Sequence, residues 1–258
     1  MNKKEKKNQD NSSRQRLIIG RKPLIEAISA GNSIEKIYLQ QGVQGEEIGI
    51  IRRLAKEHAI SISQVPSQRL NKMTKHNHQG VVAKAALIAY YEIEDILNNA
   101  DNNKKSPFII LLDGVTDIRN LGAIARSAYA FEADAIIIPS SFNAGITEEA
   151  IKTSAGALEH IPICRSSSVE TAIDLLKLHE LKILTSTLEG ETKISELNNF
   201  DNSGIAVIIG SEERGVGKYA LKQADYKIKI PINPNLDSLN ASVSAGIIFH
   251  HLYTLKSK

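Results

Sequence analysis

The stretch Ile-Ala-Val-Ile-Ile-Gly-Ser-Glu-Glu-Arg-Gly, residues 205–215, decides the fold. Its first five residues are all apolar, which is typical of a strand buried on both faces of a parallel sheet. The rest are small and polar residues of a loop. Residues 230–242 repeat this order, with Ile-Pro-Ile leading into Asn-Pro-Asn-Leu-Asp-Ser-Leu-Asn-Ala-Ser. Such loops expose backbone N–H and C=O groups to which a polar cofactor can bind.

Strand and helix patterns alternate from residue 107 onward. We expect strands at residues 108–113, 135–138, 182–186, 205–209 and 226–230, and helices at 120–131, 146–154, 169–178, 216–223 and 240–255. This alternation predicts an α/β domain whose mostly parallel sheet is covered by helices on both faces. Ligands of such sheets bind beyond the carboxyl ends of the strands. The loops expected there follow Asp113, Leu184, Ile209 and Ile230.

A smaller α/β module is predicted over residues 17–87. We expect a turn and a helix at 17–30, strands at 34–39, 60–65 and 80–86, and helices at 46–58 and 67–74. Residues 88–106 are rich in Asp, Asn and Lys, a composition typical of an inter-domain linker. The predicted organisation is a tail at 1–16, this module, the linker, and a domain at 107–258.

The composition excludes several classes of protein. Hydrophobic residues make up 42% of the 258 residues, which is enough for a core. No apolar run approaches the ~18 residues of a membrane span, and no apolar segment follows the first lysines as in a secretory signal. Cys164 is the single cysteine and cannot form an internal disulfide. We therefore expect a cytoplasmic protein without a membrane partner.

The positive charge lies at the N-terminus. Residues 1–16 hold six Lys/Arg and two acidic residues, a local charge of +4, whereas the whole chain carries +3. A short basic arm without aromatic residues is predicted to be disordered. It either neutralises phosphates non-specifically or only solubilises the chain, and its composition leaves both open.

The first candidate site motif is Asn-Leu-Gly-Ala-Ile-Ala-Arg at residues 120–126. Asn120 suits a helix N-cap because its side chain can accept a free backbone N–H. Gly122 permits close approach to the first turn. The forked guanidinium of Arg126 suits a bidentate phosphate contact. The alternative interpretation is a simple helix cap followed by a surface arginine.

The other two motifs lie in the last third of the chain. Glu212 either accepts hydrogen bonds from a cofactor or ribose, or belongs to a solvated acidic turn. Ser238 or Asn240 can cap the last helix, where Leu239, Val243 and Ile247 follow the spacing of a buried face. The Gly-x-Gly-x-x-Ala string at residues 215–220 is rejected as a dinucleotide motif, because it lies past the strand end and precedes too short a helix. The histidines show no metal-ligand spacing, so we expect no metal.

Together these motifs resemble the SpoU (TrmH-type) family of RNA 2′-O-ribose methyltransferases. The matching patterns are Asn120-x-Gly122-x-x-x-Arg126, Gly210-x-Glu212-x-x-Gly215, and Ile230-Pro-Ile with Ser238-Leu-Asn-x-Ser242. The smaller module contains Gly20-Arg-Lys-Pro and His78-Gln-Gly-Val, and is similar to the RNA substrate-binding domain of the ribosomal RNA branch.

The resemblance implies a C-terminal trefoil knot of the SPOUT type and a homodimer whose sites draw on both subunits. It also implies S-adenosylmethionine held by the knotted loops, with cofactor contacts from Gly210, Ile230 and Leu239. The resemblance further implies that Arg126 is the central catalytic residue. The ribose and Arg126 would be positioned by Asn120, Glu212, Ser238 and Asn240. Pro234 departs from the pattern, since this branch often has Gly there, and proline removes a backbone donor.

The substrate implied by the resemblance is a guanosine in large-subunit (23S) ribosomal RNA, with transfer RNA as the second candidate. Two other classes stay open. One is a catalytically lapsed RNA-binding protein of the same fold. The other is a nucleotide-dependent oxidoreductase, which rests on the rejected glycine string.

Overall fold

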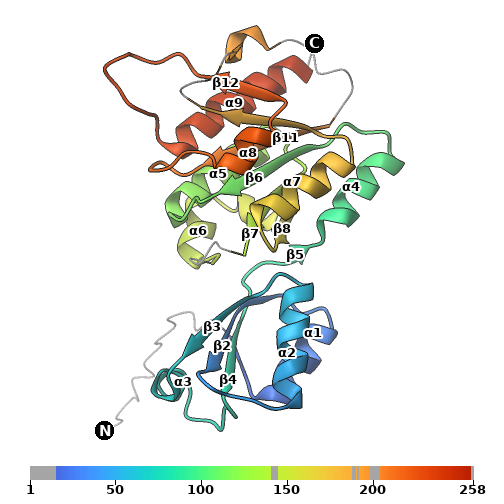
Figure 1. Cartoon of the computed structure of the whole chain (residues 1–258), viewed down its shortest axis with the longest axis vertical. Coiled ribbons are helices and arrows are strands. Elements are labelled where there is room, and N and C mark those ends of the chain that lie inside the picture. Colours follow the sequence, from blue (N-terminus) through green and yellow to red (C-terminus); the bar gives the residue numbers. More distant parts are fainter. Residues whose placement is uncertain (1–15, 141–144, 188–189, 191, 198–203, 257–258) are drawn as a thin grey trace, which may run out of the picture.

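The computed structural model describes residues 16–140, 145–187, 190, 192–197 and 204–256. The chain forms two α/β modules, the smaller at the N-terminal end (Figure 1). The predicted disorder of the basic arm concerns residues 1–16, of which all but Arg16 lie outside the described residues. In the described ranges, no helix is long and apolar enough to cross a membrane.

The smaller module has a four-stranded sheet in the order β1-β4-β2-β3. Its elements are β1 (Leu17–Ile19), α1 (Arg21–Ser29), β2 (Ile34–Gln40), α2 (Glu46–Glu57), β3 (Ser61–Val65), α3 (Ser67–Met73) and β4 (Val81–Ala85). Leu24 of α1 and Ile51 of α2 are fully buried in the cluster on one face of the sheet. Leu70 of α3 packs with Tyr38 and Val82 on the other face. Strand β1 replaces the expected turn, because its three apolar residues pair with β4.

The linker prediction for residues 88–106 is wrong. This segment forms β5 (Tyr90–Tyr91), which pairs in parallel with β8, and α4 (Ile93–Asn102). Ile93, Leu97 and Ala100 of α4 are buried. They lie four and three residues apart and so share one face of the helix. The Asp and Asn residues that suggested a linker occupy mainly the solvent side.

The larger module contains an eight-stranded sheet in the order β10-β12-β9-β11-β6-β7-β8-β5. Its remaining elements are β6 (Phe108–Asp113), α5 (Ile118–Ala130), β7 (Ala135–Pro139), α6 (Glu148–Thr153), β8 (Ile163–Ser166), α7 (Val169–Leu178), β9 (Lys182–Ser186), β10 (Thr192–Lys193), β11 (Ile205–Gly210), α8 (Lys218–Gln223), β12 (Tyr226–Lys229) and α9 (Ala241–Lys256). Within this sheet, all pairs of neighbouring described strands are parallel. The predicted α/β class with a mostly parallel sheet is confirmed.

Helices cover both faces of this sheet. The side chains of β6 alternate between two cores: Phe108 and its i+2 neighbours face α5, α6 and α9, and Ile109 faces the side of α4, α7 and α8. The ring of Phe108 meets Phe249 of α9 edge to face at 5.6 Å between centroids. A sheet buried on both faces explains the continuous apolar strands of the sequence.

The strand order gathers the candidate motifs at one edge. The chain passes from β6 outward to β8, then crosses to β9 on the other side, and β11 inserts between β9 and β6. Because the strands are parallel, the loops after β6, β9, β11 and β12 meet at their common carboxyl edge.

Candidate active site

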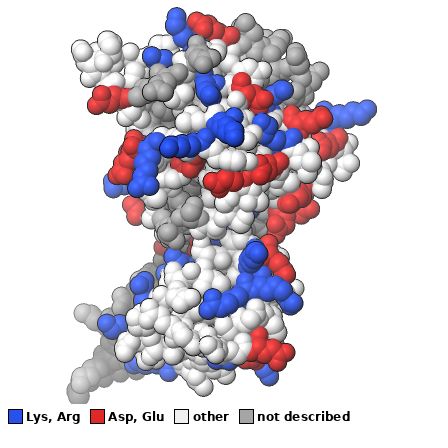
Figure 2. Space-filling view, viewed as in Figure 1, with Lys and Arg blue, Asp and Glu red and all other residues white. Residues whose placement is uncertain are grey.

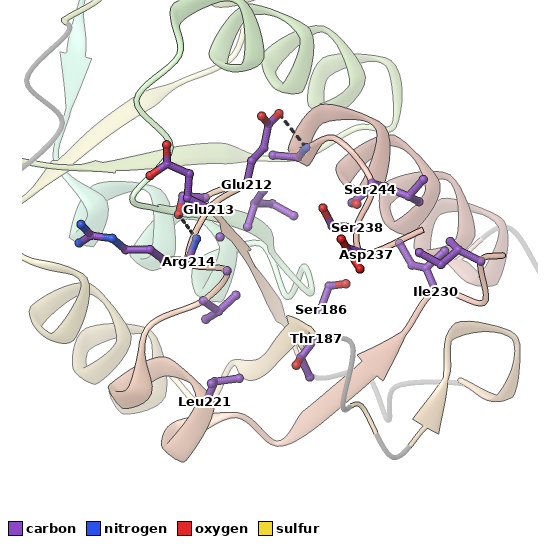
Figure 3. Close-up of a pocket in the computed structure, with 18 residues that line it drawn as sticks. Ser186, Thr187, Glu212, Glu213, Arg214, Leu221, Ile230, Asp237, Ser238 and Ser244 are labelled. Carbon is purple, nitrogen blue, oxygen red and sulfur yellow. Dashed lines mark hydrogen bonds between the residues drawn. The ribbon is translucent and has the colours of Figure 1, made fainter. Parts of the chain in front are cut away.

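A pocket of about 540 Å³ opens at the carboxyl ends of β9, β11 and β12 (Figure 3). Five of the predicted site residues line it: Gly210, Glu212, Ile230, Ser238 and Leu239. In Figure 3, Ser186, Thr187 and Ser238 surround the space between the loops, whereas Arg214 points away from it. The expectation that ligands bind beyond the strand ends agrees with this position.

The loop after β11 folds back tightly on its own strand. Backbone hydrogen bonds join Ser211 and Gly215 in both directions, at 3.2 and 2.9 Å. A Cβ on Gly210 would collide with the backbone of Gly215. Gly215 itself has φ +64°, a region that favours glycine. The two glycines therefore shape one wall of the pocket.

A hydrogen-bonded cluster of Asn120, Glu212 and Asn240 lies beside the pocket. Asn120 Nδ2 donates to Glu212 Oε1 at 3.0 Å, and Asn240 Nδ2 donates to Asn120 Oδ1 at 3.0 Å and also to Glu212 Oε1. The backbone N–H of Ala241 approaches the same carboxylate oxygen at 3.4 Å. Three of the predicted catalytic residues thus meet, although they come from three separate segments of the chain.

Asn240 is also the cap of α9, as one of the two predicted alternatives had it. Its Oδ1 accepts hydrogen bonds from the backbone of Ser242 at 3.0 Å and of Val243 at 3.4 Å. The Ser242 hydroxyl donates to the same oxygen at 2.5 Å. With its oxygen occupied by the helix, Asn240 presents its amide protons to Glu212 and Asn120.

Asn120 is not the N-cap of α5, contrary to prediction. The helix begins two residues earlier than expected, and the side chain of Asp117 caps it by accepting from Arg119 N at 2.8 Å. The earlier start places Asn120 within the first turn. Its amide is therefore free to join the cluster.

Arg126 lies apart from the cluster. It is exposed on α5 and is absent from the pocket lining. Since an α-helix turns about 100° per residue, Arg126 lies roughly 120° around α5 from Asn120. Within the described part of the chain it has no hydrogen-bond or ion-pair partner. Its guanidinium is exposed to solvent.

Packing bears out one further expectation and corrects another. What approaches Gly122 closely is helix α6, because a Cβ there would lie 2.8 Å from the carbonyl oxygen of Ala150. Val243 and Ile247 of α9 are exposed by 50% and 38% rather than buried. The buried face of α9 is formed instead by Ala245, Ile248, Phe249 and Leu252.

Sequence reasoning missed some of the residues around the pocket. Ser186, Thr187 and Asp237 are missed residues that line it. Outside the lining, Asp113 Oδ2 accepts from Gly217 N at 2.7 Å, which ties the end of β6 to the start of α8. The rule that ligands bind at strand ends gives a signal for Ser186, the last residue of β9. Among the residues described, no group of three His, Cys, Asp or Glu could hold a metal ion.

The two motifs of the smaller module lie together. The backbone N–H of Arg21 donates to Gln79 Oε1 at 3.2 Å, and its Nε donates to the Gln79 carbonyl at 3.0 Å. His78 Nδ1 accepts from Gly80 N at 3.0 Å. The segments 20–23 and 78–81 therefore form one surface feature at the start of β4.

Comparison with known proteins defines the class of this fold and site. The sequence model of the SpoU rRNA Methylase family matches residues 107–250, and that of the RNA 2′-O ribose methyltransferase substrate-binding domain matches residues 17–91. The chain therefore belongs to the SpoU methylase family.

Relatives agree with this membership, and solved structures share the fold. A protein of Bacillus subtilis named as a TrmH family tRNA/rRNA methyltransferase, YacO, is 33% identical over 92% of this chain and 94% of its own. A crystal structure of an RNA 2′-O ribose methyltransferase is 24% identical, covers 95% of this chain and 90% of its own, and has a TM-score of 0.54. The structure of AviRb from Streptomyces viridochromogenes, in complex with AdoMet, has a TM-score of 0.57 at 19% identity and covers 93% and 90%.

Proposed function

We propose that this protein transfers a methyl group from S-adenosylmethionine to the ribose 2′-hydroxyl of a guanosine in large-subunit ribosomal RNA, in the cytoplasm. The observation that carries this proposal is the Asn120–Glu212–Asn240 cluster beside the pocket at the carboxyl edge. Membership of the SpoU methylase family supports methyl transfer, and the named relatives support RNA as its acceptor.

The pocket suits the cofactor in size and chemistry. Its volume of about 540 Å³ lies in the range of small-molecule sites. Ile230 and Leu239 offer apolar contacts, backbone groups of the Gly210 loop offer hydrogen bonds, and Glu212 and Asp237 suit a ligand that carries a positive charge. Bound there, S-adenosylmethionine supplies the electrophilic methyl group.

Arg126 orients the target phosphate and stabilises the negative charge that develops on the ribose oxygen. A guanidinium stays protonated in proteins, so it serves as an electrostatic partner better than as a base. Ser238 and the cluster position the ribose against the methyl group, since transfer requires close alignment of the two. Arg126 is exposed and lies outside the pocket of its own protomer, which supports a role in the site of a second subunit.

We propose a homodimer for the same reason. Val243 and Ile247 lie four residues apart on α9 and form an exposed apolar stripe beside the site. Burial of this stripe against a second copy would remove apolar surface from water and bring a second Arg126 near the pocket. The trefoil knot also stays a proposal. It is supported by the long excursion of residues 230–240 before α9 returns to pack on α5.

The choice of RNA is tested with tritiated S-adenosylmethionine. Purified 23S ribosomal RNA, 16S ribosomal RNA and transfer RNA from cells that lack the enzyme are each incubated with the protein. We expect label in 23S RNA alone. Label in transfer RNA alone would establish the second candidate substrate. Absence of label in every RNA, with the cofactor still bound, would favour a catalytically lapsed RNA-binding protein.

A further inference from the structure

A second pocket lies where the two modules meet. It has a volume of about 240 Å³. The smaller module contributes Lys36 and Tyr38 of β2, Lys84 of β4 and Arg69 of α3, and the larger module contributes Thr147 and Arg165. The active-site pocket is lined by other residues, so the two pockets are separate.

Two lysines face one another in this pocket. Lys36 and Lys84 are directly opposite on the antiparallel strands β2 and β4, and both are half-buried. Like charges in opposed positions of a sheet destabilise it. Arg69 adds a third positive charge, since its guanidinium lies 5.8 Å from the Tyr38 ring, with Lys36 Nζ at 6.0 Å from the same ring.

Among the described residues that line the pocket, Glu35 is the one acid, and it does not neutralise these charges. Glu35 is 8% exposed, forms an ion pair with Arg165 at 3.4 Å, and accepts hydrogen bonds from Tyr90 Oη at 2.7 Å and Ile146 N at 3.2 Å. Burial raises the pKa of Tyr90 well above its ordinary value, so the phenol keeps the proton that it donates. In the described ranges, no carboxylate forms an ion pair with Lys36, Arg69 or Lys84.

Arg165 also lines the pocket, but its charge is already paired with Glu35. Its guanidinium donates to the carbonyl of Ile34 at 2.5 Å and of Glu35 at 3.0 Å, and it lies 3.6 Å from the centre of the Tyr90 ring. Arg165 thus fastens β8 of the larger module to β2 of the smaller one. Lys36, Arg69 and Lys84 stay available to an anion.

The charges of the two modules suit a polyanion. Residues 17–91 hold ten Lys/Arg against five Asp/Glu, a net charge of +5, whereas residues 92–258 hold 16 against 22, a net charge of −6. Figure 2 also shows positive side chains on the smaller module just below the waist between the modules. A nucleic acid is therefore attracted to the smaller module and repelled by much of the larger one.

The pocket lies on the same sheet edge as the active site. Pro139 and Ser166 are the last residues of β7 and β8, and Pro139 and Ser140 line the pocket. Three inter-strand spacings of ~4.8 Å separate β8 from β11, a distance of ~14 Å along the edge. A strand of RNA held at the junction can continue along this edge to the active-site loops.

We propose that Lys36, Arg69 and Lys84 form a phosphate-binding site at the junction of the two modules, which grips the backbone of the RNA substrate beside the nucleotide to be methylated. The inference rests on the proposed function for the identity of the RNA. Its contacts are to phosphates, and they add affinity without reading the base sequence.

The test is equilibrium binding of fluorescein-labelled 23S RNA transcript, without cofactor, across a series of salt concentrations. The variant is Lys36→Gln/Arg69→Gln/Lys84→Gln. The matched control is Lys22→Gln/Arg52→Gln/Lys56→Gln, which removes the same charges from exposed positions on α1 and α2. We expect the pocket variant to bind RNA about tenfold more weakly. The slope of log K against log salt is negative, and its magnitude should decrease by about 2, since each of three phosphate contacts to a single strand contributes ~0.7.

Two further measurements separate RNA binding from folding and from catalysis: the melting temperature of the pocket variant, and the labelling of RNA by the wild-type protein. The melting temperature of the pocket variant should not fall, because the substitutions relieve a like-charge contact. Equal losses of affinity and slope in the pocket variant and its control would overturn the proposal. Since binding is measured without methyl transfer, a wild-type protein that binds RNA through the pocket but labels no RNA would refute the proposed function and leave the phosphate site standing.

Discussion

Glu212 lies where three segments of the chain meet. One of its carboxylate oxygens accepts hydrogen bonds from the amides of Asn120 and Asn240 and from the backbone of Ala241. A carboxylate is suited to this role because it only accepts, and charge-assisted hydrogen bonds are stronger than neutral ones. Glu212 therefore fixes the two amides relative to the pocket.

Replacement of Glu212 by Ala should lower kcat/KM for methyl transfer by about a hundredfold, because a shift of ~1 Å in positioned groups has an effect of that size. Glu212→Gln keeps an acceptor oxygen and should retain more activity. The control is Glu149→Ala, which removes an exposed acid from α6. Steady-state kinetics with labelled cofactor provide the measurement, and activity of Glu212→Ala within twofold of wild type would exclude the positioning role.

Arg126→Ala should reduce kcat by about 10²- to 10³-fold, the usual effect of removing one group that stabilises developing negative charge. Arg126→Lys should recover little of this loss, since an ammonium lacks the planar fork. Cofactor affinity, measured by calorimetry, should stay unchanged because the proposed partner of Arg126 is the target phosphate and not the cofactor. A parallel loss of cofactor affinity would show that Arg126 acts on the pocket instead.

At the scale of elements, helix α5 joins the site to the rest of the larger module. It packs against α9 on one side and α6 on another. Gly122 permits the second contact, since a Cβ there would lie 2.8 Å from both the Ala150 oxygen and the Thr153 Cβ. Asn120 stands half a turn earlier on the same helix, so this packing also sets the position of the cluster.

Gly122→Ala should destabilise the protein by about 1–3 kcal/mol, the usual effect of overpacking. Gly246→Ala is the matched control in α9, where the nearest atom to a new Cβ is Ser127 Oγ at 3.6 Å. That change should stabilise the helix by about 0.5–1 kcal/mol, since alanine is the better helix former. Urea denaturation distinguishes the two, and equal effects at both positions would contradict the packing account.

The sequence predicts the elements whose signals are local. The central strand β6 and helix α7 have the expected bounds, because continuous apolar runs and a Ser168 cap mark them. Strand β5 and helix α4 are missed, since a two-residue strand has no pattern and polar residues mask the apolar face of α4. The exposure of Val243 and Ile247 also cannot be predicted, because helical spacing alone does not say which face meets the sheet.

The residues of the candidate site are predicted better than their contacts. Asn120, Glu212 and Asn240 stand out as polar residues after buried strands. Their meeting depends on the order of strands in the sheet, which places residues 92 and 120 positions apart within hydrogen-bonding distance. Asp117 caps α5. Asp and Asn are equally good caps, so the sequence does not distinguish Asp117 from Asn120.

At the scale of the whole molecule, the relative position of the modules depends on a few buried contacts. Glu35 and Arg165 are 8% and 12% exposed and join β2 to β8. Ser61 Oγ also donates to the carbonyl of Ser140 across the junction at 2.7 Å. These contacts therefore fix the position of the phosphate site relative to the active site.

Glu35→Gln should destabilise the protein by about 3–5 kcal/mol, because it leaves the charge of Arg165 buried without its partner. The control is Glu57→Gln, which breaks the exposed ion pair with Arg53 on α2 and should change stability by less than about 0.5 kcal/mol. Thermal unfolding measures both. A Glu35→Gln protein as stable as its control would show that the junction does not depend on this pair.

The central claim is methyl transfer to a ribose, and alkaline hydrolysis of RNA labelled by this protein tests it most directly. A 2′-O-methyl group blocks the attack of the hydroxyl on the neighbouring phosphate, so that linkage survives alkali. We predict that the label appears in alkali-resistant dinucleotides that begin with guanosine. Label released only as mononucleotides would mean that the methyl group is on a base, and would contradict the account.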